Sequence, residues 1–482
     1  MILKHKKGLL FFIILSIFIT IESLFAAYDL GEFFDMGNVW TATPTDFFST
    51  VNIQGQTPAF DWTSRTERKL ARSPAYANSP EIHLWNMPIW EVIASFPNQK
   101  LSQLNCSLYN KGDAEGKQQK IQGSIVIKDR RIFFKRLQTY ASLISKWAGN
   151  KGSKMKARRI STGGVKVMRH VWTKKPNYIV QMKWGYSEAN SKSNKHFIAE
   201  FITLIFKPYT KAKDPTIRHL SSVKDRYKGW AKDKNWKINI KKNFKGDLYV
   251  SGIPMVNQGQ KGYCVVAALE RMLGYYECKI DQHVLAQLGK SSGTGGTDIA
   301  IMIKTLEDAD TKLGIHVKVK YQFTEDIRDI ENFVKKYNRY ANRMNKTEIN
   351  NNMWIQRLGN TIRYDISRLF SLLDPDVYKT VKLKKYRSDY KRFKRDIVNE
   401  IAEGRPLLWG VYLGIFPEPG INLQPGGVGG HARLIIGYNK KSNELLYSDT
   451  WGSGHELKRM PFDNAWTIST FLTTIKPRKR QY

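Results

Sequence analysis

The chain has 482 residues, of which 41% are hydrophobic and 12% aromatic, and its formal net charge is +36. This composition excludes a disordered polyelectrolyte, and the length suggests about two or three domains, since single domains usually have about 100–200 residues. The positive charge favours acidic partners, but lysine and arginine are spread along the whole chain without a zinc-finger spacing or an aromatic RNA-binding signature. We therefore expect a basic, solvated surface and do not expect nucleic acid as the main partner.

The N-terminal residues have the three parts of a secretory signal peptide. A lysine-rich start precedes an apolar run over residues 8–20, and Ala26 and Ala27 supply small residues for cleavage. An uncleaved anchor is the alternative, but the run is shorter than the roughly 20 apolar residues of a membrane-spanning helix. We predict that residues 1–26 are removed and that the mature protein is soluble, without a membrane span, and either secreted or periplasmic.

The next part of the chain changes character near residue 80. Residues 27–79 are rich in Thr, Ser, Asp and Pro without a sustained hydrophobic period, which predicts an extended lead-in. Strand-like alternation and one helical pattern follow, with a hairpin expected around Lys174–Pro176. We therefore predict a small α+β domain of unknown role over residues 80–209 and a basic linker over residues 210–247.

A second domain is predicted over residues 248–476, followed by a basic tail at residues 477–482. The apolar residues of "CVVAALERMLGYYE" fall on one face of a helix, and residues from about 324 to 403 are strongly charged with a helical pattern, which predicts a helical insertion. Three short segments bounded by Gly, Pro or Asn indicate strands of an antiparallel sheet: "PLLWGVYLGI", "HARLIIGYN" and "ELLYSDTWG". The predicted fold class of the chain is α+β.

The three cysteines, Cys106, Cys264 and Cys278, are too few for a disulfide framework, so the fold is expected to depend on its hydrophobic cores. A Cys106–Cys278 bridge stays open as an alternative. Cys264 starts the predicted helix, directly after the glycine-containing turn "NQGQKGY". A helix N-terminus favours the thiolate form of a cysteine, and the backbone N–H of Cys264 points toward an oxyanion formed on an attacked carbonyl. Gln258, six residues upstream, is placed to supply a second donor.

A buried structural cysteine is the alternative to a nucleophile, so the downstream residues matter. His431 begins a predicted strand after "GGVGG", and Asp449 ends the next strand. Adjacent antiparallel strands bring such side chains within hydrogen-bonding reach, where a carboxylate fixes the tautomer and orientation of the imidazole. Trp451 is placed to cover that hydrogen bond from water. These positions predict a Cys264–His431–Asp449 triad.

The motifs resemble those of papain-like cysteine peptidases, most closely the group related to bacteriocin double-glycine leader peptidases. The resemblance depends on "QGQKGYC", "CVVAALERMLGYY", "GHARLIIGYN" and "SDTWG", which occur in this order over roughly residues 250–475. It implies that Gln258 is the oxyanion donor, Cys264 the nucleophile, His431 the acid and base, and Asp449 the residue that orients the imidazole.

The comparison with the family pattern also gives substrate contacts and some departures. "GTGGT" is similar to the Gly-Gly stretch of papain, which implies that the backbone of Gly295 and Gly296 binds the substrate, and Trp451 is expected to line the same cleft. Val265 stands where the family has an aromatic residue after the nucleophile, and the charged insertion lengthens the spacing to the histidine. No ATP-binding motif follows the domain, which argues against a transporter-coupled leader peptidase.

The leading hypothesis is an exported cysteine peptidase that cleaves a peptide or protein substrate, with acidic substrates favoured by the basic surface. The alternatives are a wall amidase or transglutaminase-like acyl transferase, against which Gln258 argues, and a catalytically silent papain-like binding module, against which the complete set of site residues argues. No group of His, Cys or acidic residues has the spacing of metal ligands, so neither a metal nor a cofactor is expected. We expect the N-terminal region to be an accessory domain rather than a removed pro-segment.

Overall fold

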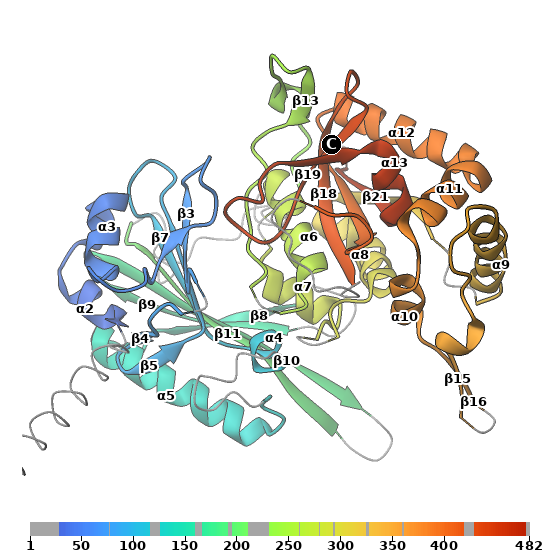
Figure 1. Cartoon of the computed structure of the whole chain (residues 1–482). Helices are drawn as coiled ribbons and strands as arrows, with labels where there is room; N and C mark the ends of the chain where they lie inside the picture. Colours follow the sequence, from blue (N-terminus) through green and yellow to red (C-terminus); the bar gives the residue numbers. More distant parts are fainter. Residues whose placement is uncertain are drawn as a thin grey trace, which may run out of the picture. The chain divides into compact units, whose positions relative to one another are not determined.

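In the computed structural model, the chain separates into two units that each have their own sheets (Figure 1). The first comprises residues 1–222 with 292–295, and the second comprises residues 223–291 with 296–482. The predicted signal peptide and most of the predicted basic tail lie outside the described residues. None of the described helices is long and apolar enough to cross a membrane. The structure describes residues 28–478 except residues 77, 116–125, 160–165, 191–194, 211–230, 260, 279, 293–294, 324–326, 359–360 and 419–428.

The described part of the N-terminal unit has an eight-stranded antiparallel sheet and a small three-stranded sheet. Helix α5 (Arg130–Ala148) is capped by the Asp129 side chain, ends at Gly149 in the left-handed conformation, and packs against the large sheet. The hairpin predicted around Lys174–Pro176 is confirmed by the pairing of β9 with β10. The large sheet has the order β2 (Asp61–Trp62), β3 (Leu70–Ser73), β6 (Glu91–Ser95), β7 (Gln103–Asn110), β11 (Lys195–Pro208), β10 (Tyr178–Asn190), β9 (Lys166–Lys174), β8 (Ser153–Arg159), and the small one β1 (Tyr28–Asp29), β4 (Ile82–Leu84), β5 (Met87–Ile89).

The prediction of an extended lead-in over residues 27–79 is wrong. Its described residues contain two helices, α2 (Leu30–Asp35) and α3 (Pro44–Val51), capped by the side chains of Asp29 and Thr43. The aromatic residues of these helices, among them Phe34 and Phe47, are buried in the core of the N-terminal unit. Helices of six and eight residues are too short to produce a sustained hydrophobic period, although burial of their aromatic rings stabilises them.

The C-terminal unit is built on a sheet of its own. In the described part of the chain this sheet has eight strands, and their pairing is antiparallel throughout. Its central strand, β18, is buried at nine of its ten positions, because α6 and α12 both pack against it. The three predicted strand segments form β17, β18 and β19. The sheet has the order β12 (Ile240–Lys242), β13 (Asp247–Val250), β18 (Gly430–Asn439), β17 (Leu407–Tyr412), β21 (Ser469–Pro477), β14 (Ile315–Gln322), and β19 (Glu444–Ser448) pairs with β18 and with β20 (Lys458–Pro461).

Helices lie around this sheet, and the predicted nucleophile helix is α6, which packs against β18 and β17 (Figure 1). Between β14 and β17 the chain forms four helices and the hairpin of β15 (Ile355–Leu358) and β16 (Thr361–Tyr364) in its described residues. The mixed α+β class is thereby confirmed. The helices of this unit are α6 (Cys264–Tyr275), α7 (Gln282–Leu288), α8 (Ile299–Leu313), α9 (Ile327–Arg343), α10 (Ile366–Ser371), α11 (Pro375–Lys385), α12 (Arg387–Ala402) and α13 (Phe462–Ile468).

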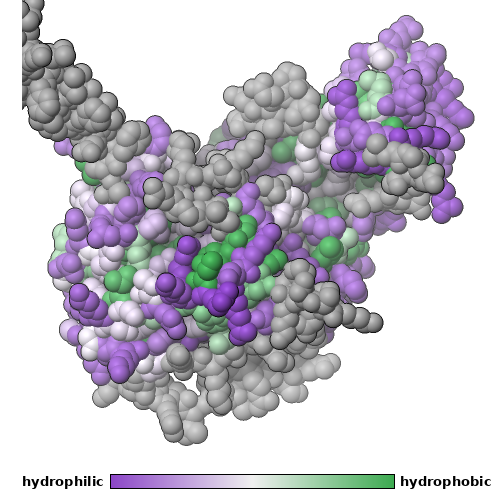
Figure 2. Space-filling model, turned by 90° about the horizontal axis from the view of Figure 1, so that it is seen from below, coloured by the Kyte–Doolittle hydropathy of each residue, from purple (hydrophilic) through white to green (hydrophobic). Residues whose placement is uncertain are grey.

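Part of the segment expected to be a basic linker belongs to the C-terminal unit. Residues 231–247 contain the 3₁₀ turn Trp236–Asn239 and the edge strand β12, which pairs with β13. The buried Trp236 ring explains why this lysine-rich segment is ordered. On the face of the molecule drawn in Figure 2, hydrophilic residues cover most of the coloured surface, and hydrophobic residues gather in smaller patches, in agreement with the charge of the chain.

Candidate active site

Cys264 is the first residue of α6 and is only partly buried. Within the described residues no side chain caps this helix, so the N–H groups of its first turn are free for other partners. The backbone N–H groups of Val265 and Ala432 donate to the sulfur of Cys264. The preceding turn requires a glycine, because Gly259 has a φ of +72° while its N–H donates to Asn257 Oδ1 at 2.8 Å. The thiol therefore lies where backbone dipoles favour a negative charge.

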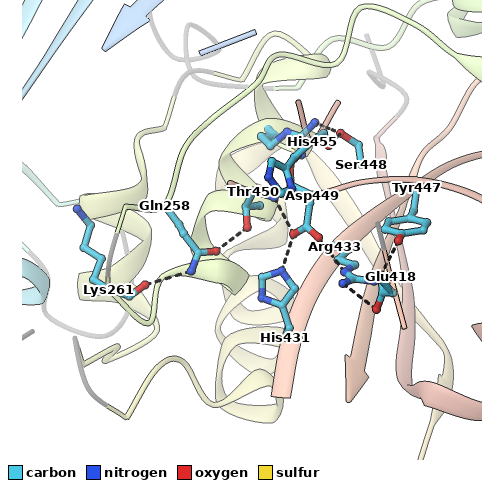
Figure 3. A network of polar contacts seen from close by, with 11 residues as sticks. Gln258, Lys261, Glu418, His431, Arg433, Tyr447, Ser448, Asp449, Thr450 and His455 are labelled. Carbon is cyan, nitrogen blue, oxygen red and sulfur yellow. Dashed lines mark hydrogen bonds and ion pairs between the residues drawn. The ribbon is translucent and has the colours of Figure 1, made fainter. Parts of the chain in front are cut away.

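Strands β18 and β19 bring the predicted triad partners together. They pair antiparallel with Leu434 opposite Ser448, and continuing that register past the end of β19 puts Trp451 opposite His431. Because side chains alternate along a strand, Asp449 and Trp451 face the same side of the sheet as His431. Nε2 of His431 lies 2.5 Å from Oδ1 of Asp449, and both side chains are buried (Figure 3).

The remaining ring nitrogen of His431, Nδ1, is left for the hydrogen bond that joins this residue to Cys264. Burial alone would raise the pKa of the Cys264 thiol, but the hydrogen bond and charge of His431 and two backbone N–H groups lower it below its ordinary value. Burial alone would lower the pKa of His431, but the Asp449 carboxylate and Cys264 raise it to about 9. The two shifts have the directions expected of a thiolate–imidazolium pair.

Asp449 is fully buried and held by the backbone around it. Its Oδ1 accepts the N–H of Thr450 at 2.9 Å, and its own N–H donates to the carbonyl of His455 at 2.9 Å. Burial would raise the pKa of this carboxyl, but the positive charges of His431 and Arg433 hold it well below its usual range. These contacts favour the ionised carboxylate and fix its orientation.

Gln258, the predicted oxyanion donor, is buried with its amide locked in one orientation. Oε1 accepts a hydrogen bond from Thr450 Oγ1 at 2.6 Å, and Nε2 donates to the carbonyl of Lys261 at 3.2 Å (Figure 3). The N–H of Gln258 also donates to the carbonyl of Thr450 at 2.8 Å. An amide nitrogen carries two hydrogens, and among the described residues the Lys261 carbonyl accepts only one of them. The second hydrogen is free to donate to a bound oxyanion.

Trp451 and His455 enclose the His431–Asp449 hydrogen bond. The Trp451 ring stacks on the His431 imidazole with 4.4 Å between centroids and 15° between planes. His455 meets the same indole edge to face at 5.4 Å. His455 therefore contributes to the frame of the site through both its carbonyl and its ring.

Gly295 and Gly296 follow α7 in a tight turn. The N–H of Gly295 donates to Ser292 Oγ at 2.7 Å, and Gly296 has a φ of +73°, which favours glycine. A Cβ added at Gly296 would lie 3.5 Å from the carbonyl oxygen of Gly262, two residues before Cys264. Gly296 therefore lies beside the nucleophile turn, whereas the hydrogen bond of Gly295 keeps it within its own loop.

Arg271 was missed by the sequence analysis although it connects the two halves of the site. It lies seven residues after Cys264, which is about two helical turns, so both side chains lie on the same face of α6. Its guanidinium donates to the carbonyl of Asp449, to Ser448 Oγ and to the carbonyl of Pro254. The spacing of seven residues, which puts this arginine in line with Cys264 on the predicted helix, is a signal that the sequence contained.

None of the three cysteines forms a disulfide in the structure. Burial raises the pKa of the Cys278 thiol to about 12 and raises that of Cys106 as well, whereas the pKa of Cys264 is lowered. In the described ranges of the chain, no group of three or more His, Cys, Asp or Glu residues is placed to hold a metal ion.

Comparison with known proteins agrees with this geometry. Residues 250–474 match the model of the Peptidase_C39 like family. This part of the chain is therefore similar to the C39-like group of papain-like cysteine peptidases, which confirms the resemblance inferred from the four motifs. The matched residues begin at the last residue of β13 and include most of β21, so they contain the strands β14 to β20 of the C-terminal unit. No curated protein matches the chain.

Proposed function

We propose that the protein is an exported cysteine peptidase that uses Cys264, His431 and Asp449 as its triad and Gln258 as an oxyanion donor. The observation that carries the proposal is the hydrogen-bonded series from Cys264 through His431 to Asp449, in which the pKa of the thiol is lowered and that of the imidazole is raised to about 9. Such opposite shifts prepare a nucleophile and an acid at the same pH.

The reaction follows from the positions of these groups. The thiolate of Cys264 attacks the carbonyl carbon of a peptide bond, and the oxyanion accepts hydrogen bonds from the Cys264 backbone N–H and the Gln258 amide. His431 then gives its proton to the leaving amine, which departs and leaves a thioester on Cys264. Water attacks the thioester while the now neutral His431 takes its proton, and the carboxylic acid product and the free thiolate are released.

Thiol labelling tests the nucleophile directly. The full chain would be treated with iodoacetamide at pH 6, and the three cysteines mapped by mass spectrometry. We expect Cys264 alone to react, because burial keeps Cys106 and Cys278 as protonated thiols. Cys106 and Cys278 are internal controls, because each molecule contains one copy of each of the three cysteines. Equal labelling of all three cysteines, or none at Cys264, would show that Cys264 is not the activated thiol.

A substrate test separates the peptidase from the alternative chemistries. The full chain and its Cys264→Ser variant would be incubated with a peptide library containing acidic and neutral members, and new termini identified by mass spectrometry. Cleavage by the parent alone supports a peptidase, and faster cleavage of acidic members supports the proposed role of the positive surface. Transfer of acyl groups to added amines without hydrolysis would favour the acyl transferase instead.

Export is the second part of the proposal and depends on the sequence of the first 27 residues. N-terminal sequencing of the protein recovered from outside the cytoplasm is expected to begin directly after residue 26. Retention of the first 26 residues would argue for an anchored protein. A mature form beginning near residue 245 would show that the N-terminal unit is a removed pro-segment.

A further inference from the structure

Arg433 lies two residues after His431 on β18, so both side chains lie on the same face of the strand. Its Nε is 3.0 Å from Oδ2 of Asp449, the carboxylate oxygen that does not contact His431. Both the guanidinium and the carboxylate are fully buried. The two oxygens of Asp449 thus contact two different cations, the His431 imidazolium and the Arg433 guanidinium.

The far side of Arg433 is held by Glu418. Nη1 and Nη2 donate to the two carboxylate oxygens of Glu418 at 2.7 and 3.2 Å, and Glu418 is itself almost fully buried. Tyr447 donates its hydroxyl to Glu418 at 2.5 Å, and its ring lies under the guanidinium, 4.7 Å from Cζ. Glu418 therefore holds the Nη1 and Nη2 end of the guanidinium by two hydrogen bonds, whereas Nε faces Asp449 Oδ2 at ion-pair distance without forming a hydrogen bond.

Charges alternate along this row of side chains, from positive His431 through negative Asp449 and positive Arg433 to negative Glu418 (Figure 3). Removing a carboxylate and a guanidinium from water costs several kcal/mol for each ion, and apolar residues of similar size usually stabilise a fold at least as well. Stability alone is therefore a poor explanation for this buried pair. Its contact with the triad carboxylate suggests a role in the reaction.

We propose that Arg433, held in place by Glu418, is a positioning residue of the peptidase site that fixes the Asp449 carboxylate and moderates how tightly His431 keeps its proton. The proposal depends on the proposed function, since it assigns a role in the same reaction. An unopposed carboxylate would hold the imidazolium proton more strongly than the leaving amine requires. The positive charge of Arg433 beside Asp449 weakens the stabilisation that this carboxylate gives to the His431 imidazolium. The negative charge of Glu418 partly compensates the charge of Arg433 and so limits this weakening.

Other titratable and charged groups also face this row, from α6, from β19 and β20, and from the loop between these two strands. The Lys458 and His455 side chains lie near Asp449 and have lowered pKa values, mainly because of burial. Arg271 contacts the backbone carbonyl of Asp449 rather than its carboxylate. Among the described residues, these groups are Cys264 and Arg271 on α6, Tyr447 on β19, Lys458 on β20, and His455 and Glu456 in the loop between β19 and β20.

The test measures the proton affinity of His431 rather than turnover. Full-length protein with ¹³C-labelled histidine would be titrated by NMR in a Cys264→Ala background, and the His431 signal assigned by its loss in His431→Ala. Glu418→Gln leaves Arg433 uncompensated, so we expect the pKa of His431 to fall by about one unit. In the double variant Arg433→Met with Glu418→Met, both charges are gone, and we expect this pKa to rise above that of the parent background.

Glu403→Gln is the matched control, because it removes the same charge from an exposed ion pair with Lys237. It is expected to leave the His431 pKa unchanged. Opposite shifts in the two test variants support the proposal. Equal pKa values in all the variants would overturn it and leave the pair a purely structural one. If Glu418→Gln fails to fold, the double variant alone decides, because an apolar pair avoids an unpaired buried charge.

A failure of the proposed function would look different. The NMR titration does not depend on hydrolysis, so a protein that cleaves no peptide can still show the opposite pKa shifts. Conversely, an active peptidase with an unchanged His431 pKa in all variants would reject only the role of Arg433. The two results are therefore independent.

Discussion

Cys264 and Arg271 lie about two turns apart on the same face of α6, and Arg271 donates to the backbone carbonyl of Asp449. One helix therefore carries the nucleophile and also holds the segment that orients the histidine. The distance between the thiol and the imidazole is thus fixed by a single rigid element together with the β18–β19 register. A peptidase of this type needs such rigidity, because small displacements of catalytic groups reduce the rate strongly.

Arg271→Met tests this connection. The variant leaves the carbonyls of Asp449 and Pro254 without their charged donor, and each such hydrogen bond contributes about 1.5–3 kcal/mol. We expect the free energy of unfolding to fall by roughly 3 kcal/mol, and kcat to fall more than KM rises. Urea unfolding and steady-state kinetics measure the two effects.

The control for this variant is Arg392→Met, which removes an exposed arginine from a surface ion pair with Asp389. Its effect on stability is expected to stay within about 0.5 kcal/mol. An Arg271→Met protein as stable and as active as the control would show that Arg271 does not connect the two halves of the site.

Much of this site could be predicted from local patterns, and the remainder depends on tertiary contacts. The helical period after Cys264 and the short apolar strands around His431 and Asp449 are local signals, and the structure brings these residues together. The position of Arg433 beside His431 could also have been predicted, because side chains alternate along a strand. The role of Glu418 could not have been predicted, because its contact with Arg433 depends on where the residues directly after β17 lie in the fold.

The N-terminal unit shows the opposite case. The two helices of residues 30–51 have six and eight residues, so no sustained period marked them in the sequence. Their position is decided by aromatic packing with distant residues, such as the stacking of Phe34 on Phe206 at 4.2 Å. Such a contact between residues far apart in the sequence has no local signature.

Gln258→Ala tests the oxyanion hole. The Gln258 amide is held by Thr450 and Lys261 before any substrate arrives, and in the proposed mechanism it stabilises charge that appears only in the transition state. We expect kcat to fall by about 10²–10³, with little change in KM. The comparison uses steady-state kinetics on one peptide. A variant with the kcat of the parent would exclude Gln258 as an oxyanion donor and favour a transglutaminase-like site.

The pH dependence of kcat/KM follows from the two shifted groups. Activity is expected to begin below the ordinary thiol pKa, because the pKa of Cys264 is lowered, and to fall as the pH rises through about 9, where His431 loses its proton. Asp449→Asn removes a charge that raises the pKa of His431, so its alkaline fall should move to lower pH by roughly 1–3 units.

Asp449→Asn is expected to retain measurable activity, since the thiolate–imidazolium pair can form without the carboxylate. Glu277→Gln removes the same charge from an exposed pair with Lys234 and is the control, with an expected profile equal to that of the parent. An unchanged alkaline limb in Asp449→Asn would mean that this limb reports a group other than His431.

Lys382 on α11 is a buried cation without a carboxylate partner among the described residues. Its Nζ donates to Tyr321 Oη at 2.9 Å and faces the rings of Tyr321, Phe323 and Trp466 at 4.5–5.3 Å. Burial lowers the pKa of Lys382 to about 7 from 10.5. The unfolded chain therefore binds one more proton than the folded protein between these values, so this residue destabilises the fold below about pH 7 and ceases to do so as the pH rises through 10.5.

Lys382→Met keeps the length of the side chain and removes the charge. The pKa shift corresponds to about 5 kcal/mol and the ring faces offset roughly 2, so we expect the variant to be more stable than the parent by about 3 kcal/mol at pH 6. That gain should largely disappear at pH 10. Urea unfolding at both pH values measures it, with exposed Lys384→Met as the control from the same helix. If Lys382→Met changes the free energy of unfolding equally at pH 6 and pH 10, the charge of Lys382 does not destabilise the fold. The contacts with the aromatic rings then compensate fully for its burial.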